Sequence, residues 1–190
     1  MAVPNLEIKP PMTVLKSSGD KLLVAINRET AFVHVVGRGT FKVSTSLKRF
    51  SIAAVKRRCS RFVVDLEACT AMDSTFMGVL AGLAFKMQRA GQGEIYLVNL
   101  STRLQSLLTT LGLDRVMRIN LEGSTPSEFL DSLEMASDFD ETDQESETRR
   151  DRAETMLDAH EALVDVSAEN LPKFKDVLAF LREDLDKGGP

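Results

Sequence analysis

A serine beside a carboxylate at the start of a helix is the pattern in this sequence that most favours regulated chemistry. Ser74 directly follows Asp73, after a hydrophobic strand over residues 62–66 and a short polar loop, and an apolar helical stripe comes next. At a helix start, a serine hydroxyl caps free backbone amides. A phosphate on that hydroxyl would add a charge of about −1.5 to −2 at neutral pH, which the amides and the helix dipole could hold. Ser74 is therefore predicted to be either a structural cap or a phosphorylation switch, with Thr75 as the nearest competing acceptor.

The remaining residues that could do chemistry do not form a catalytic or metal-binding pattern. His34 alternates within an apolar strand and His160 lies in an apolar helical stripe, so each is expected in a core or an interface. Cys59 and Cys69 lack metal-ligand spacing and are predicted to be reduced thiols. Ser74 is not in a nucleophile-elbow pattern, and neither common type of glycine-rich phosphate loop is present. The sequence therefore predicts a protein that is not an enzyme, with no metal site and no cofactor.

Strands and helices are expected to alternate between residues 21 and 136. Runs rich in β-branched residues predict a hairpin of 22–26 with 32–36, strands at 62–66 and 95–98, and a short edge strand at 117–119. Helical stripes between these strands predict helices around 47–55, from Ser74 to a stop at Gly91, at 104–111, and from Thr125 onward. This alternation predicts an α/β layer with a mixed sheet. Asp65 and Glu67, at the end of the central strand, are interpreted as ordinary strand-end polar residues rather than a catalytic pair.

The residues around Ser74 resemble the signature of the sulfate-transporter and anti-sigma-factor-antagonist (STAS) domain. The resemblance covers roughly residues 21–136 and rests on Val63-Val64-Asp65-Leu66, Met72-Asp73-Ser74-Thr75, Gly78-Val79-Leu80 and the segments 91–100 and 108–116. One departure is Phe76, which stands where the family more often has glycine. The resemblance implies a STAS-like mixed β-sheet covered by helices.

In anti-sigma-factor antagonists, the serine that matches Ser74 is phosphorylated by the partner kinase. The resemblance therefore implies a signalling module that binds an anti-sigma factor/serine kinase or a phosphatase-linked regulator. Its partner-binding residues would be Asp73, Ser74, Thr75, Phe76 and Met77. The alternative is a constitutive STAS subunit of a transporter or stress-sensing assembly, in which Ser74 is only a cap and Phe76 and Met77 are permanent contacts.

Charge divides the chain into a basic domain and an acidic appendage. Residues 1–135 contain 17 Lys/Arg and 12 Asp/Glu, a net charge of +5, whereas residues 136–190 contain 7 and 16, a net charge of −9. The predicted organisation is an N-terminal arm (1–20), the STAS-like domain (21–136), an acidic linker (137–148) and a C-terminal helical pair (149–187). An isolated helical pair would be marginally stable, so its apolar faces are expected either to dock on the basic face of the domain or to form a homo-oligomer. That basic face comprises Lys48, Arg49, Lys56, Arg57, Arg58 and Arg61.

Composition argues against two further classes of partner. The chain has a net charge of −4, few aromatic residues and no Trp, which disfavours nucleic-acid binding. The longest apolar run, at 77–85, is about half of a membrane span, so no direct membrane insertion is expected. No basic segment followed by an apolar core is found near Met1, which together with the cysteine usage predicts a cytoplasmic protein.

Overall fold

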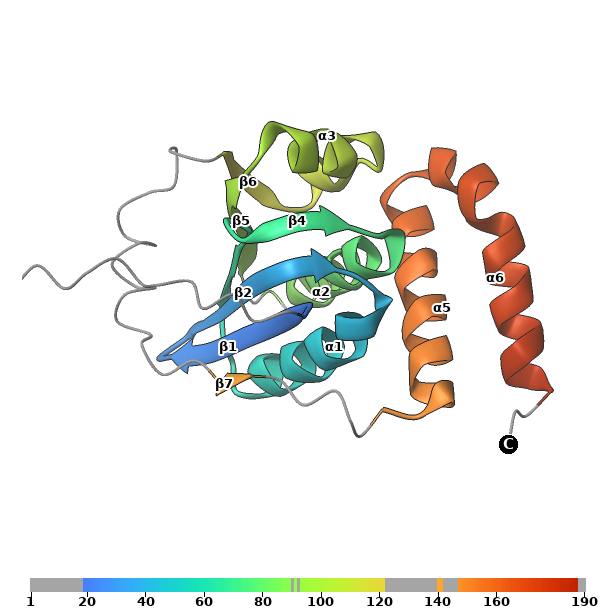
Figure 1. The fold of residues 1–190 in the computed structure, drawn as a ribbon, viewed down its shortest axis with the longest axis horizontal. Helices are drawn as coiled ribbons and strands as arrows, with labels where there is room; N and C mark the ends of the chain where they lie inside the picture. Colours follow the sequence, from blue (N-terminus) through green and yellow to red (C-terminus); the bar gives the residue numbers. More distant parts are fainter. Residues whose placement is uncertain (1–18, 90, 92, 122–139, 142–146, 188–190) are drawn as a thin grey trace, which may run out of the picture.

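Seven strands form one mixed β-sheet in the part of the chain that this computed structural model describes, residues 19–89, 91, 93–121, 140–141 and 147–187 (Figure 1). The strand order is β6-β5-β3-β2-β1-β7, and β4 lies off this path beside β2. The strands are β1 (Lys21–Asn27), β2 (Thr30–Gly39), β3 (Arg61–Asp65), β4 (Cys69–Met72), β5 (Glu94–Leu100), β6 (Arg118–Leu121) and β7 (Asp140–Glu141). The predicted α/β class with a mixed sheet is confirmed.

The pairing directions follow from the lengths of the connections. β1 and β2 pair antiparallel across a two-residue turn, which confirms the predicted hairpin. β2, β3, β5 and β6 pair parallel, and the connections between these neighbours carry the helices that parallel crossovers require. β7, two residues of the predicted acidic linker, pairs antiparallel with β1 at the other edge of the sheet.

The helices lie where the apolar stripes predict them. They are α1 (Phe41–Lys56), α2 (Ser74–Arg89), α3 (Thr102–Thr110), α5 (Arg149–Val166) and α6 (Leu171–Asp186). The main core lies between the sheet and these helices, and its largest fully buried members include Leu22, Leu47, Phe62, Phe76, Leu80, Met87, Ile95 and Leu97. A smaller cluster of Phe32, Val63 and Val98 is separate from that core. The predicted arm at 1–18 and the predicted helix at Thr125 lie outside the described residues.

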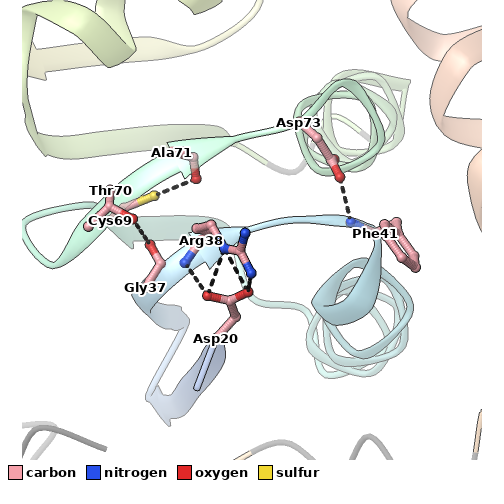
Figure 2. Close-up of polar contacts among 8 residues, drawn as sticks. All are labelled: Asp20, Gly37, Arg38, Phe41, Cys69, Thr70, Ala71 and Asp73. Atoms are coloured by element: carbon pink, nitrogen blue, oxygen red, sulfur yellow. Dashed lines mark hydrogen bonds and ion pairs between the residues drawn. The ribbon is translucent and has the colours of Figure 1, made fainter. Parts of the chain in front are cut away.

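The segment expected to be a short polar loop before α2 contains a strand. β4 pairs parallel with the last residues of β2, after a register shift between Gly37 and Arg38. Thr70 Oγ1 donates to the Gly37 carbonyl at 3.1 Å, and the Arg38 backbone N–H donates to Asp20 Oδ1 at 2.9 Å (Figure 2). Gly37 has φ +80°, so glycine suits this bend. The extra pairing places the start of α2 beside the start of α1.

The C-terminal helical pair packs on the α/β domain through α5. Figure 1 shows α5 between the domain and α6, and α5 contacts both α1 and α2. α5 begins with a reciprocal cap, in which Asp151 N–H donates to Thr148 Oγ1 and Thr148 N–H donates to Asp151. Of the two expected arrangements, docking on its own domain is the one that the structure shows, and the homo-oligomer stays a prediction.

Candidate functional site

Asp73 connects the N-termini of α1 and α2. Its Oδ2 accepts the Phe41 backbone N–H at 2.8 Å (Figure 2). Its Oδ1 accepts the Phe76 backbone N–H at 2.9 Å. Its own N–H donates to the Gly39 carbonyl at 3.0 Å. One carboxylate thus satisfies free amides at the positive ends of two helices. The capping role that the sequence allowed for Ser74 belongs to Asp73, because Asp73 is the residue immediately before the helix.

Ser74 contacts α5 instead. Its Oγ lies 3.0 Å from His160 Nε2, and His160 Nδ1 lies 2.7 Å from the Met156 carbonyl. A carbonyl oxygen only accepts, so Nδ1 carries the proton, and in the neutral ring Nε2 accepts the proton of the Ser74 hydroxyl. His160 is 3% exposed and its ring centroid is 5.0 Å from that of Phe174 on α6. The hydroxyl of the predicted switch is therefore bonded to a buried side chain of the C-terminal helical pair.

A serine hydroxyl bonded to a histidine also has the geometry of a nucleophile and its base. In such catalytic pairs a third group orients the histidine and a substrate reaches the serine. Here the orienting group is the Met156 carbonyl within the same helix, and α6 covers the imidazole through Phe174. The Ser74–His160 pair is thus built as a contact between α2 and α5.

The other three predicted partner-binding residues are buried. Thr75 is 3%, Phe76 0% and Met77 5% exposed, and Phe76 and Met77 belong to the main core. A Cβ on Gly39 would lie 2.8 Å from the Phe76 ring, so the aromatic ring occupies the space beside that glycine. Burial of Phe76 and Met77 leaves these side chains little surface to offer to a partner, and their partner-binding role stays a prediction. Of the five residues, Asp73 and Ser74 remain partly accessible.

A second polar cluster lies at the ends of the central strands. Asp65 Oδ2 lies 2.7 Å from His34 Nδ1, while its Oδ1 accepts Asn99 Nδ2–H at 2.9 Å and the Glu67 backbone N–H at 3.1 Å. Burial raises the pKa of Asp65, but the hydrogen bonds from His34 and Asn99 outweigh it and hold the pKa below its ordinary value. Asp65 is therefore a buried, hydrogen-bonded carboxylate and not the ordinary strand-end polar residue that the sequence pattern predicts.

Replacing Asp65 with asparagine is expected to cost about 1–3 kcal/mol of unfolding free energy at neutral pH, because buried donors lose a charged acceptor. A lowered folded pKa adds stability above the unfolded pKa of about 4, and this stability disappears as the pH falls through the folded value. The difference between Asp65→Asn and wild type should therefore shrink below about pH 4. Urea midpoints from pH 7 to pH 3 measure it, with the exposed Asp114→Asn as control. A difference that stays constant down to pH 3 would contradict this assignment.

Within the described residues, no group of three or more His, Cys, Asp or Glu side chains could hold a metal ion. Cys59 and Cys69 are free and buried, and burial raises the pKa of both thiols. Among the described helices, none combines the length and the apolar character that crossing a membrane requires.

Comparison with known families identifies the domain around Ser74. The model of a family described as "Mlab, STAS domain" matches residues 22–122, more than half of the chain. The chain belongs to this STAS family. The match spans the strand-loop-helix segment of Ser74 and ends before α5, so the C-terminal helical pair lies outside the matched STAS region.

Solved structures with a similar fold include anti-sigma factor antagonists. One, from Mycobacterium paratuberculosis, has 21% identity and a TM-score of 0.49, covering 63% of this chain and 96% of its own. The phosphorylated form of the Bacillus cell fate determinant SpoIIAA has 20% identity and a TM-score of 0.46, covering 60% of this chain and 98% of its own. No curated protein matches the sequence.

Proposed function

We propose that this STAS protein is a non-enzymatic signalling module resembling an anti-sigma-factor antagonist, which binds an anti-sigma factor/serine kinase or a phosphatase-linked regulator in the cytoplasm. Ser74 is its phosphorylation switch. The observation that carries the proposal is the position of Ser74: first residue of α2, next to a carboxylate that connects two helix N-termini, within the matched STAS region. The kinase would supply ATP and magnesium, so the chain itself needs no cofactor.

The chemistry of the site supports a switch driven by charge. A phosphate on Ser74 would stand at the positive end of the α2 dipole but one residue from the Asp73 carboxylate. The unmodified surface is small and uncharged at Ser74, whereas the phosphorylated surface would carry two adjacent anionic groups. A partner that tolerates the first would be repelled by the second if its own surface is acidic.

Intact-mass and fragment mass spectrometry on protein from its native cells tests this function first. We expect a phosphate on Ser74 in a fraction that changes with growth and stress conditions. Once a partner copurifies, Ser74→Glu should weaken its binding at least about tenfold, whereas Ser74→Ala should preserve it. Ser106→Glu, at an exposed serine of α3, is the matched control. Equal affinity of the Ser74→Glu, Ser74→Ala and wild-type chains would rule out the switch.

A second candidate is a constitutive STAS subunit of a transporter or stress-sensing assembly. The bond between Ser74 and His160 favours it, since a permanently docked α5 would keep the hydroxyl occupied. An unmodified Ser74 under all conditions, together with copurification of an ATPase subunit, would select this candidate.

A further inference from the structure

Small residues allow α5 to approach α2 closely. A Cβ on Gly78 would lie 2.2 Å from the Ala159 carbonyl oxygen, so the two backbones are in contact there. One turn later on α2, a Cβ on Gly82 would lie 3.7 Å from the Ala162 Cβ. Ala159 and Ala162 are 2% and 8% exposed. The face of α2 that starts at Ser74 is thus shaped to receive a helix with small residues three positions apart.

Charge sets the orientation of the docked helix. Lys48 Nζ lies 2.6 Å from Asp158 Oδ2, and Arg49 Nη2 lies 3.1 Å from Asp151 Oδ2. Glu147, just before α5, accepts the Ser46 hydroxyl proton at 3.0 Å. These pairs are partly exposed, and such pairs contribute about 0–1 kcal/mol each. They position α5 on the basic face of α1, while Ala159, Ala162 and Leu163 bury it against the main core.

A groove open to solvent borders the contact between α5 and the domain. Its volume is about 180 Å³, and its lining includes Lys48 of α1, Gly78, Gly82 and Lys86 of α2, and Asp158 and Ala159 of α5. Its lining combines the apolar side of α2 with two lysines of the domain.

We propose that α5 is a displaceable internal ligand of the surface through which the STAS domain binds its partner. This inference rests on the proposed function and names the regulation of that same site: the Ser74 hydroxyl is released from its hydrogen bond to His160, and so becomes free to react with a kinase, only when α5 detaches. The external partner that fits the surface is an amphipathic helix with small residues three positions apart, flanked by acidic side chains. Binding of that partner and docking of α5 exclude each other.

The contacts of His160 connect the docking of α5 to Ser74 itself. The hydroxyl is engaged by His160, whose other nitrogen is fixed by Met156 and whose ring contacts Phe174. A kinase must bring the γ-phosphate of ATP in line with this oxygen, which requires that the oxygen leave its hydrogen bond to His160. Partner affinity is therefore reduced by the fraction of molecules that have α5 docked.

Alkylation of Ser74→Cys by iodoacetamide in the full-length chain measures this access without any partner. Ala159→Glu would bury an unpaired charge against α2 and so release α5, whereas Ala179→Glu makes the same change at an exposed position of α6. We expect Cys at position 74 to react about tenfold faster or more with Ala159→Glu, and at the unchanged rate with Ala179→Glu.

Equal alkylation rates in the Ala159→Glu and Ala179→Glu backgrounds would overturn the inference. Cys59, which is fully buried, reports on the core within the same samples, because peptide mapping resolves it from position 74. If Cys59 also reacts, Ala159→Glu has opened the core, and the double variant Lys48→Glu/Arg49→Glu replaces it, since this variant breaks only the partly exposed ion pairs to Asp158 and Asp151. Faster alkylation of position 74 in the double variant would then support the inference, and an unchanged rate would overturn it. A different outcome separates this inference from the proposed function. If alkylation shows that docked α5 protects position 74, but mass spectrometry finds no phosphate on Ser74 in Ala159→Glu chains isolated from cells, the phosphorylation switch is refuted and the docking of α5 over Ser74 stands.

Discussion

Replacing Gly78 with alanine is expected to loosen α5 from the domain, whereas the same replacement at Gly82 leaves it docked. The new Cβ at position 78 would meet the Ala159 carbonyl at 2.2 Å, which is backbone and cannot rotate away. Overpacking of this kind costs about 1–3 kcal/mol, more than the roughly 0.5–1 kcal/mol that alanine gains over glycine inside a helix. At Gly82 the Cβ would lie 3.7 Å from the Ala162 Cβ, an ordinary van der Waals distance, so the replacement keeps only the stabilisation that alanine gives to a helix.

Amide hydrogen exchange on α5 and α6 distinguishes the two variants. Gly78→Ala should increase exchange across both helices while the strands β2, β3 and β5 keep their protection. Gly82→Ala should match or exceed wild-type protection and thermal midpoint. Identical exchange rates in the two variants would mean that the backbones of α2 and α5 are not in contact at Gly78 and Ala159.

The strands and helices of the domain could be predicted because their patterns are local. The alternation in residues 22–36 and the helical stripes before and after the central strand specify which face of each element is apolar. β4 could not be predicted this way, since Cys69–Met72 is short and carries no alternating pattern. It becomes a strand only because the bend at Gly37 turns the end of β2 toward it.

The contact that most changes the interpretation of Ser74 has no local signal. Ser74 and His160 are 86 positions apart, and the apolar stripe around His160 shows that its face is covered without showing what covers it. The charge asymmetry does carry part of the answer. An acidic appendage beside a basic domain predicts docking on the face of Lys48 and Arg49, and both residues do pair with α5. Which helix lies beneath α5 depends on the glycine at position 78, whose role appears only in three dimensions.

Similarly, the departure of Phe76 from the family pattern acquires a physical meaning only from its neighbour. The ring fills the space above Gly39, at the junction of β2 and α1, and is fully buried. The Phe76 ring therefore supports the packing beneath Asp73 and Ser74, and its burial leaves no exposed surface for a partner to touch in this arrangement. Phe76 is thus expected to affect the stability of the site, whereas Asp73 and Ser74 are expected to affect how a partner recognises it.

Phe76→Ala is accordingly expected to lower the free energy of unfolding by about 3–5 kcal/mol, the usual cost of removing a buried phenyl ring and leaving a cavity. Phe180→Ala is the matched control, because that ring is 63% exposed on α6 and its loss should stay within about 0.5 kcal/mol. Urea denaturation of both variants measures the difference. If Phe76→Ala had wild-type stability but lost a copurifying partner, Phe76 would be a contact residue after all. A destabilised Phe76→Ala chain that binds its partner with wild-type affinity while folded would instead establish that the ring acts only from within the core.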